Sequence, residues 1–320
     1  ITYTNAAVKE IEERVNHKNL NVSTIHDFLW DNIKHFQKEL KESLIALFND
    51  EDVKQLKIDD LTSVPSDYYE NREEPVSIQY KEYLKLRDGI ISHDELLILS
   101  EYMFRKYWKL CDIVKDKYKF IFIDEYQDTH EEVVKILLEY LPRTTKKCII
   151  GFFGDAMQAI YDTGIGDIDA YKGDGKGQVK EVKKVQNRRN PRAVITLANR
   201  LRTDGIIQEA SGDITAPNMV EGTLKDGSVL FLYSDNDDIS NVEHFLSENY
   251  GWDFSCANKT KELNLTHNLI ADKAGFRTLM DVYDKDLIFA FKKRIKDYIK
   301  DNNIMEVFSD NTFGEVIDFL

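Results

Sequence analysis

Two short apolar runs, each followed by acidic residues, dominate the hydrophobic pattern of the chain. Residues 119–123 form an aromatic and β-branched run that stops at the acidic stretch 124–128. Residues 148–153 repeat this design and stop at Gly154 and Asp155. Such runs are typical of buried strands in a parallel sheet, where ligands bind beyond the carboxyl ends of the strands. We therefore expect both acidic groups to lie at one ligand-binding edge.

The sequence between and before these runs predicts helices. Apolar residues recur on one stripe between Thr129, a candidate N-cap, and Leu141, so the central segment is expected to fold as strand, helix, strand. Residues 1–4 are expected to end a strand. Asn5 can cap a helix that runs to about Val15.

The long segment 29–116 shows helical periodicity on both sides of a polar middle, which favours an inserted helical region. It contains an aromatic stripe that can stack on nucleic-acid bases, although such stripes more often pack between helices. The members of the stripe are Tyr102, Phe104, Tyr107 and Trp108.

The pattern in the last third of the chain continues an α/β layer. Strands are expected at 228–233 and 254–257, with helices at 239–250 and 260–273. Further helical segments are expected at residues 287–299 and 305–320.

Composition limits the functional classes. The chain has 320 residues and 42% hydrophobic content, enough for two globular domains. Its net charge of −14 argues against a general nucleic-acid coat protein, because phosphate binding needs clustered Lys and Arg, so any nucleic-acid contact must be local. The three cysteines form neither a zinc nor a disulfide pattern. No apolar run reaches membrane-spanning length, and we expect a cytoplasmic protein without membrane contact.

The acidic runs carry candidate chemistry. Adjacent carboxylates at a strand end suit phosphate chemistry, since one can hold hydrated Mg²⁺ while its neighbour orients and deprotonates the attacking water. For Asp124 and Glu125 alone, a pair of solvated turn acids is the alternative. However, the run DEYQD at 124–128, followed one helix and one strand later by GDAMQAIY at 154–161, resembles motifs II and III of the UvrD-like superfamily 1 helicases.

That resemblance implies specific roles for residues of the two motifs. Asp124 would hold the Mg²⁺ of bound ATP, and Glu125 would activate the attacking water. Gln158 would sense the γ-phosphate by hydrogen bonding, and Tyr161 would contact DNA.

A basic segment follows these motifs. Between Lys180 and Arg202, eight basic residues stand against a single acid, which favours phosphate binding. The run QNRRNP at 186–191, followed by a helix, resembles motif IV of the same helicases. The resemblance implies that Arg189 reaches the γ-phosphate from a second domain. Arg188 departs from the aromatic residue that usually stacks on adenine in this family, but an arginine can also stack on the base. A solvated basic helix start is the alternative.

Two N-terminal stretches resemble the DNA-facing motifs Ia and Ib of these helicases. They are residues 2–14 and 23–28, which lie upstream of the acidic motifs in the family's order. Taken alone, the two stretches favour a capped helix and a core-packed histidine, and it is their order upstream of the acidic motifs that supports the resemblance. The DNA-contacting residues that the resemblance implies are Thr2, Tyr3, Thr4, Asn5, Thr24 and His26.

The resemblance also implies an α/β fold built from the parallel sheets of RecA-like P-loop NTPases, with inserted helical subdomains. Residues 1–28 and 117–178 would form the first RecA-like domain (1A) without its P-loop, and 29–116 a 1B-like helical insertion. Residues 179–275 would form part of the second RecA-like domain (2A). Residues 276–320 would begin a 2B-like helical insertion.

The function implied is that of an ATP-dependent DNA helicase or translocase, which couples Mg-ATP hydrolysis to movement on single-stranded DNA or at a single-strand/duplex junction. No G-x-x-x-x-G-K-[ST] P-loop occurs in the sequence, so we expect the 320-residue chain alone to be inactive. The alternative is a non-catalytic helicase-like subunit that partners a nuclease in DNA repair or anti-phage defence. A third hypothesis, a metal-dependent nuclease, leaves Gln158 and Arg189 without a role. Its candidate ligands are Asp124, Glu125, Asp128 and Asp155.

Overall fold

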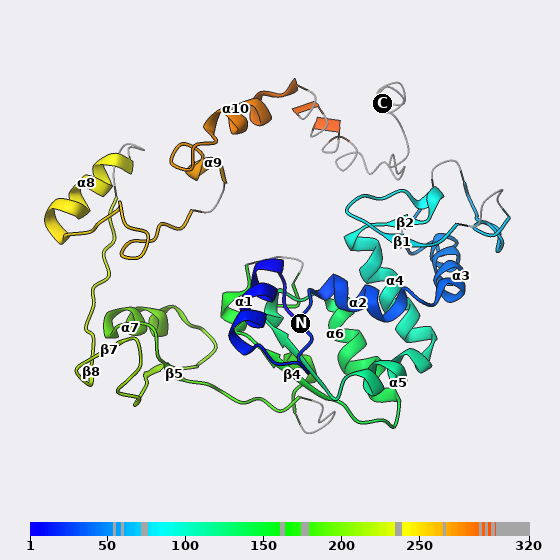
Figure 1. Cartoon of the computed structure of the whole chain (residues 1–320), viewed down its shortest axis with the longest axis horizontal. Helices are drawn as coiled ribbons and strands as arrows, with labels where there is room; N and C mark the ends of the chain where they lie inside the picture. Colours follow the sequence, from blue (N-terminus) through cyan, green and yellow to red (C-terminus); the bar gives the residue numbers. More distant parts are fainter. Residues whose placement is uncertain are drawn as a thin grey trace. The chain divides into compact units, whose positions relative to one another are not determined.

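The described chain divides into two compact units (Figure 1). The computed structural model describes residues 1–53, 56–58, 61–71, 76–160, 164–173, 179–233, 239–264, 267–287, 290–291, 294–295 and 298. Unit 1 contains Ile1–Lys184 and Arg202–Gly205. Unit 2 contains Val185–Leu201 and the described residues from Ile206 onward.

Unit 1 combines helices with short parallel strands. Its helices are α1 (Asn5–Val15), α2 (Ile25–Ile33), α3 (Gln37–Phe48), α4 (His93–Lys106), α5 (Trp108–Lys117) and α6 (Glu131–Lys135), which a π-helical turn, Ile136–Tyr140, continues. Its strands are β1 (Gln79–Tyr80), β2 (Ile90–Ile91), β3 (Phe120–Asp124) and β4 (Ile149–Phe153). β1 pairs with β2 and β3 pairs with β4, both in parallel, so the predicted strand–helix–strand unit is confirmed.

Local hydrogen bonds decide where two of these helices begin. The Oγ1 atom of Thr4 accepts a hydrogen bond from the backbone N–H of Ala7 (3.2 Å), so Thr4 caps α1 and Asn5 is its first residue. The predicted cap of the central helix was wrong. Thr129 ends a 3₁₀ turn through its backbone N–H, and α6 begins two residues later at Glu131.

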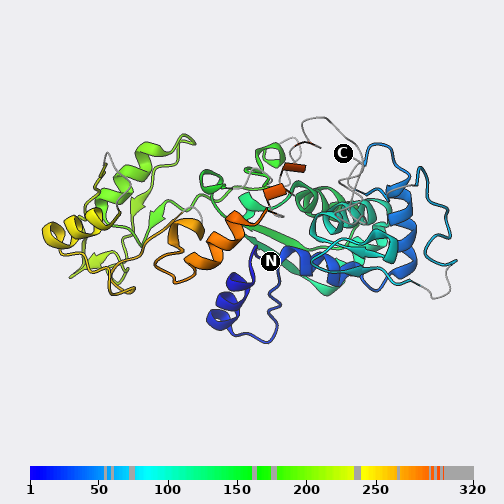
Figure 2. The ribbon, with the colours of Figure 1, turned by 90° about the horizontal axis from the view of Figure 1, so that it is seen from above.

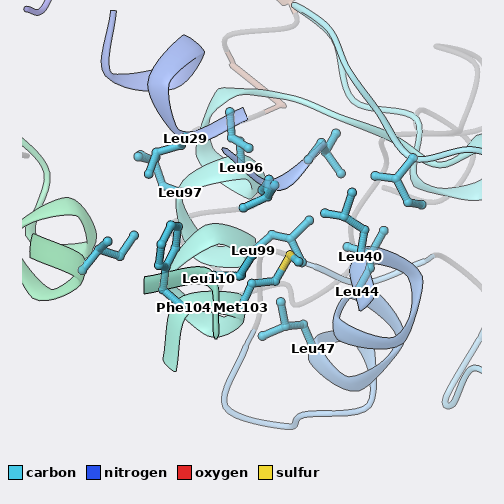
Figure 3. Close-up of a cluster of buried hydrophobic side chains, with 14 of the residues drawn as sticks. Leu29, Leu40, Leu44, Leu47, Leu96, Leu97, Leu99, Met103, Phe104 and Leu110 are labelled. Carbon is cyan, nitrogen blue, oxygen red and sulfur yellow. The ribbon is translucent and has the colours of Figure 1, made fainter. Parts of the chain in front are cut away.

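The core of unit 1 lies among α2, α3, α4 and α5 (Figure 3). Leu29, Leu44, Leu99 and Leu110, one from each of these helices, are buried there. Ile121 of β3 belongs to the same cluster, so the helices pack directly against the strands that carry the acidic motifs. Each buried leucine contributes roughly 1.5–3 kcal/mol through removal of apolar surface from water.

The β3–β4 sheet is buried on one face only. Ile121 and Ile123 of β3 point into the core, whereas Phe120 is 59% exposed and Phe153 of β4 is 54% exposed. Successive side chains of a strand point to opposite faces, so the helical core covers one face and leaves the other open. The prediction of fully buried strands was therefore wrong for half of their side chains.

The aromatic stripe serves packing only in part. Phe104 of α4 is buried in the core, as expected for contact between helices. Trp108 at the start of α5 is 56% exposed, and the Lys109 ammonium lies 6.0 Å from the centre of its ring. α1 contributes no buried residue and extends away from the helical core (Figure 2).

Unit 2 contains shorter elements. Its helices are α7 (Arg192–Leu201), α8 (Ile239–Tyr250), α9 (His267–Ile270) and α10 (Arg277–Lys285). Its strands are β5 (Gln186–Asn187), β6 (Glu209–Ala210), β7 (Met219–Val220) and β8 (Thr223–Leu224). β5 and β6 pair in parallel, and β7 and β8 are antiparallel. α7 and α8 confirm the helices predicted after motif IV and at 239–250.

Two strands predicted for this unit do not form. Residues 228–233 adopt no strand, and the side chain of Phe231 is 89% exposed, so this apolar run is not an interior strand. At 254–257 the chain turns instead. The Asp253 carboxylate accepts hydrogen bonds from the backbone N–H (3.1 Å) and hydroxyl (2.6 Å) of Ser255, a local arrangement that competes with strand formation.

Of the predicted helix at 260–273, the described residues form only α9, four residues long. The predicted helix at 287–299 is described only in part, and 305–320 lies outside the described residues. The fold is mixed α/β with short parallel sheets, while the RecA-like assignment and its domain boundaries stay predictions. Among the described helices, none combines the length and apolar character needed to cross a bilayer.

We predict that Leu99→Ala destabilises unit 1 by about 2–5 kcal/mol, because the fully buried side chain leaves a cavity among α2, α3 and α4. Chemical denaturation followed by circular dichroism measures this change. Leu20→Ala is the matched control, since Leu20 is 40% exposed, and its effect should stay within about 0.5 kcal/mol. Equal effects of the two substitutions would contradict the position of the core.

Candidate functional site

The two acidic motifs meet at one end of the β3–β4 sheet. Parallel register pairs Asp124, the last residue of β3, with Phe153, the last residue of β4. Gly154 and Asp155 follow directly, so the carboxyl ends of both strands open onto the same edge. The predicted placement of the acidic groups is confirmed.

Glu125 occupies an uncommon backbone conformation at this edge. Its φ of 51° and ψ of 49° lie in the left-handed region, which costs a non-glycine residue about 1–3 kcal/mol. Its side chain is exposed, and its Oε2 atom accepts a hydrogen bond from Nε2 of Gln127 (2.8 Å). Asp124 is also exposed, and its backbone N–H donates to the carbonyl of Ile1 (2.9 Å). The carboxylates are thus presented to solvent on an anchored turn.

Gln127 joins the two motifs. Its side chain is buried, and its Oε1 atom accepts a hydrogen bond from the backbone N–H of Asp155 (3.1 Å) while its Nε2 atom holds Glu125. Gly154 must be small here, because a Cβ atom at this position would lie 2.3 Å from Oε1 of Gln127. The sequence analysis gave Gln127 no role. The signal for its role was its chemistry, because a Gln side chain can donate one hydrogen bond and accept another and so can join two strand-end loops.

The Asp155 carboxylate accepts four hydrogen bonds. Its Oδ1 accepts from Nη2 of Arg202 (2.8 Å) and from the backbone N–H of Met157 (3.1 Å). Its Oδ2 accepts from Nη1 of Arg202 (2.6 Å) and from Nε2 of Gln158 (3.0 Å). The Arg202 guanidinium, more than these other donors, lowers the pKa of the Asp155 carboxyl, although partial burial opposes the shift. Asp155 is therefore ionised at neutral pH.

Gln158 lies one turn beyond Asp155, as its predicted role requires. It ends a 3₁₀ turn, Ala156–Gln158, and is exposed at the same edge as Glu125. A continuous chain of hydrogen bonds runs from Glu125 through Gln127 and Asp155 to Gln158. The structure thus brings Asp124, Glu125 and Gln158 to one end of the sheet.

Motif IV lies in unit 2 at a turn between β5 and α7. The Oδ1 atom of Asn187 accepts hydrogen bonds from the backbone N–H groups of Arg189 (3.1 Å) and Asn190 (2.9 Å). The Arg189 side chain is exposed, whereas the Arg188 guanidinium forms an ion pair with the carboxylate of Asp213. The turn therefore presents Arg189 to solvent, while Arg188 is engaged locally.

The basic segment is less available for phosphate than its composition predicts. Arg188, Arg192 and Arg202 each form an ion pair with an aspartate. Arg202 belongs to unit 1 and holds Asp155, a function that its place in the basic run concealed. Sequence charge alone cannot distinguish an arginine that faces solvent from one that is neutralised by a distant carboxylate.

The N-terminal residues predicted to contact DNA lie beside motif II. Thr2 forms a parallel bridge with Thr24, and its backbone N–H donates to the Ser23 carbonyl (3.1 Å). Both threonines are buried, and the Thr24 hydroxyl donates to the Asp27 carboxylate (2.7 Å) while capping α2.

The remaining candidates differ in exposure. Tyr3 packs partly against the core, and Thr4 and Asn5 are exposed at the start of α1. Tyr161 lies outside the described residues.

His26 sits in a cluster of rings that the sequence did not reveal. Its ring centre lies 4.7 Å from that of His93 and 6.4 Å from those of His130 and Tyr80, which come from three other segments. Burial, followed by the charges of His93 and His130, lowers the pKa of His26 to about 4. The half-buried imidazole is therefore neutral at physiological pH. Within the described chain, no group of His, Cys, Asp and Glu side chains is arranged to hold a metal ion by itself.

The donor set at the sheet edge suits a nucleotide-bound magnesium ion. Asp124 offers an exposed carboxylate, the hard oxygen ligand that Mg²⁺ prefers, and Mg²⁺ binds through one or two protein carboxylates when phosphates supply further oxygens. Gln158 adds an exposed amide for a phosphate oxygen. These two residues thus fit the magnesium ion and the terminal phosphate of Mg-ATP.

Comparison with known proteins agrees with these motifs. Residues 29–176 match the family model of the UvrD/REP helicase N-terminal domain. The chain is 29% identical to the Gabija protein GajB of Bacillus cereus (strain HuB5-5) in an alignment 365 positions long that covers 88% of this chain and 51% of GajB. It is 27% identical to the probable DNA helicase II homologs of Rickettsia conorii and Rickettsia felis in alignments 241 positions long that cover 62% of this chain and 36% of each relative.

The chain thus spans about half the length of GajB and about a third of the two Rickettsia relatives. The family match covers motif II, motif III and the helical region before them. Residues 29–176 of the chain are thus similar to the UvrD/REP helicase N-terminal domain, and the geometry of the sheet edge agrees with this similarity.

Proposed function

We propose that the protein is an ATP-dependent DNA helicase or translocase that couples Mg-ATP hydrolysis to movement on single-stranded DNA or at a single-strand/duplex junction. The observation that carries this proposal is the hydrogen-bond chain from Glu125 through Gln127 and Asp155 to Gln158. It links a candidate general base to a candidate phosphate sensor across two strand ends, and both groups are needed at one site for nucleotide hydrolysis.

Each residue of the edge has a role in the proposed reaction. Mg²⁺ would supply charge neutralisation for the phosphates, with the Asp124 carboxylate as its protein ligand. Glu125 accepts the proton of the attacking water, and the hydrogen bond that Gln127 donates to Glu125 fixes the orientation of the carboxylate. Gln158 donates to an oxygen of the γ-phosphate, and the planar guanidinium of Arg189 stabilises charge that develops on the transferred group. Arg188 would contact the nucleotide base after leaving Asp213.

DNA would lie along the paired N-terminal segments. The Thr2–Thr24 bridge joins the two predicted DNA motifs, and the Ile1 carbonyl accepts a hydrogen bond from the backbone N–H of Asp124, which supports a DNA path adjacent to the nucleotide edge. Because the side chains of Thr2 and Thr24 are buried, they would support this path and not contact the DNA strand. Tyr3, Thr4, Asn5, His26 and Tyr161 are the proposed contacts. The proposed location is the cytoplasm, without membrane contact.

A non-catalytic helicase-like subunit that partners a nuclease, in DNA repair or anti-phage defence, is the second candidate. This candidate applies if a G-x-x-x-x-G-K-[ST] run, which these 320 residues lack, is also missing from the full-length protein. DNA-stimulated ATP hydrolysis by the full-length gene product supports the motor, and tight DNA or nuclease binding without hydrolysis supports the subunit.

The 320-residue chain, purified alone, is predicted to hydrolyse ATP negligibly, because it offers no P-loop lysine to hold the β- and γ-phosphates. A steady-state phosphate-release assay with and without single-stranded DNA measures this. Turnover of about 1 s⁻¹ or more would contradict the prediction.

In the full-length protein, Glu125→Gln is predicted to lower kcat for DNA-stimulated ATP hydrolysis by about 10²–10⁴-fold, since the amide cannot accept the water proton. The KM for ATP should change little, because the ligands of the phosphates remain. Glu131→Gln is the matched control on an exposed glutamate of α6, and it should retain full activity. Equal kcat values for Glu125→Gln and the unmodified protein would rule out the assigned base.

The third prediction concerns His26. His26→Ala should weaken single-stranded DNA binding by about 1–3 kcal/mol through loss of a stacking surface. A pKa of about 4 means that the imidazole takes up its proton only in acid, so this difference should stay constant from about pH 6 to about pH 8. Fluorescence anisotropy with a labelled oligonucleotide measures it, with exposed His35→Ala as control. A His26 contribution that grows steeply as the pH falls through 6.5 would show that the ring binds phosphate as a cation.

A further inference from the structure

The Arg202 guanidinium forms hydrogen bonds with the loop that carries Gln158. Its two terminal nitrogens donate to the two carboxylate oxygens of Asp155, at 2.6 Å from Nη1 to Oδ2 and 2.8 Å from Nη2 to Oδ1. The Arg202 side chain is only 9% exposed. A two-point contact of this kind fixes the orientation of the carboxylate as well as its charge.

The same carboxylate orients the candidate phosphate sensor. Oδ2 of Asp155 accepts from Nη1 of Arg202 and also from Nε2 of Gln158, and Oδ1 accepts from the backbone N–H of Met157. Rotation of the Asp155 side chain would break all of these bonds together. The position of the Gln158 amide therefore depends on what holds Asp155.

The turn that bears Gln158 has little stability of its own. It is a single 3₁₀ turn of three residues, Ala156–Gln158, with Asp155 as its N-cap. So short a turn fixes several backbone angles for very few hydrogen bonds, and its shape must come from outside contacts. Gln127 supplies one through the Asp155 backbone N–H, and Arg202 supplies the other through the carboxylate.

The segment after α7 also holds the Arg202 guanidinium. Nε and Nη2 of Arg202 donate to the two carboxylate oxygens of Asp204, at 3.0 Å and 2.5 Å. The hydroxyl of Thr203 lies 3.5 Å from Sδ of Met157, a second contact with the sensor turn. Residues 202–204 therefore clamp the turn at Asp155 and at Met157.

We propose that Arg202 is a positioning residue for nucleotide hydrolysis, which holds Gln158 in register with the γ-phosphate through Asp155. This inference rests on the proposed function. Arg202 does not touch the nucleotide in this scheme. It acts by setting the geometry of a turn that does, and small displacements of positioning groups are costly to rate. The lowered pKa of Asp155 supports the arrangement, because it keeps the carboxylate ionised for Arg202 and Gln158.

The test compares Arg202→Gln and Arg202→Lys in the full-length protein by DNA-stimulated ATP hydrolysis. Arg202→Gln is expected to lower kcat about 10–100-fold while the KM for ATP changes less than about threefold, because phosphate ligation is intact but the sensor is misplaced. Arg202→Lys keeps a charge without the two-point grip, so it should recover only part of kcat. Arg105→Gln is the matched control, since Arg105 is half exposed and pairs loosely with Glu101 at 3.6 Å.

A double-mutant cycle separates positioning from general stability. If Arg202 acts through Asp155, then Arg202→Gln should lower kcat no further in an Asp155→Asn background. Thermal melting of each variant shows whether it is folded. If Arg202→Gln does not fold, Arg202→Lys replaces it in the cycle. Unchanged kcat in a folded Arg202 variant, or additive losses in the cycle, overturns the inference.

Failure of the inference is distinguishable from failure of the proposed function. If Glu125→Gln abolishes hydrolysis while Arg202→Gln does not affect it, the proposed ATP-dependent function is supported and the positioning role of Arg202 is refuted. If the full-length protein does not hydrolyse ATP at all, the proposed function falls, and the inference that rests on it falls too.

Discussion

The buried Gln127 amide is the contact on which the arrangement of the site depends. It is the point where the loops after β3 and β4 are joined, with its nitrogen on Glu125 and its oxygen accepting from the Asp155 backbone. A buried amide that lost either partner would leave an unpaired polar group, at a cost of about 1–3 kcal/mol. The absence of a Cβ atom at Gly154 makes this contact possible, and the left-handed backbone of Glu125 is a local cost that accompanies it.

The fold makes that contact possible by holding the two strands rigidly from one side. Ile121 and Ile123 anchor β3 in the helical core, and the parallel register carries β4 with it. Both loops therefore leave a fixed edge, and short hydrogen bonds suffice to connect them. The helical region before motif II belongs to the same core, so its contribution to the site is support of the sheet.

The parallel strand pair, the helix between them, the start of α7 and the extent of α8 were all predictable, because each follows from local periodicity or a local stop signal. The edge position of Asp124, Glu125 and Gln158 followed from strand order. The strand predicted at 254–257 failed because Asp253 makes a competing turn with Ser255. The role of Arg202 could not be predicted, since its partner Asp155 lies 47 residues away in sequence. Contacts between distant segments carry no periodic signature.

The central claim is that one sheet edge binds Mg-ATP through residues of separate motifs. The most direct measurement is a crystal structure of the full-length protein with Mg²⁺ and a non-hydrolysable ATP analogue. The account predicts that a carboxylate oxygen of Asp124 lies within Mg²⁺ coordination reach, directly or through a bound water, and that the Gln158 amide is hydrogen-bonded to the terminal phosphate. A nucleotide bound elsewhere, with Asp124 and Gln158 facing only solvent, would contradict it.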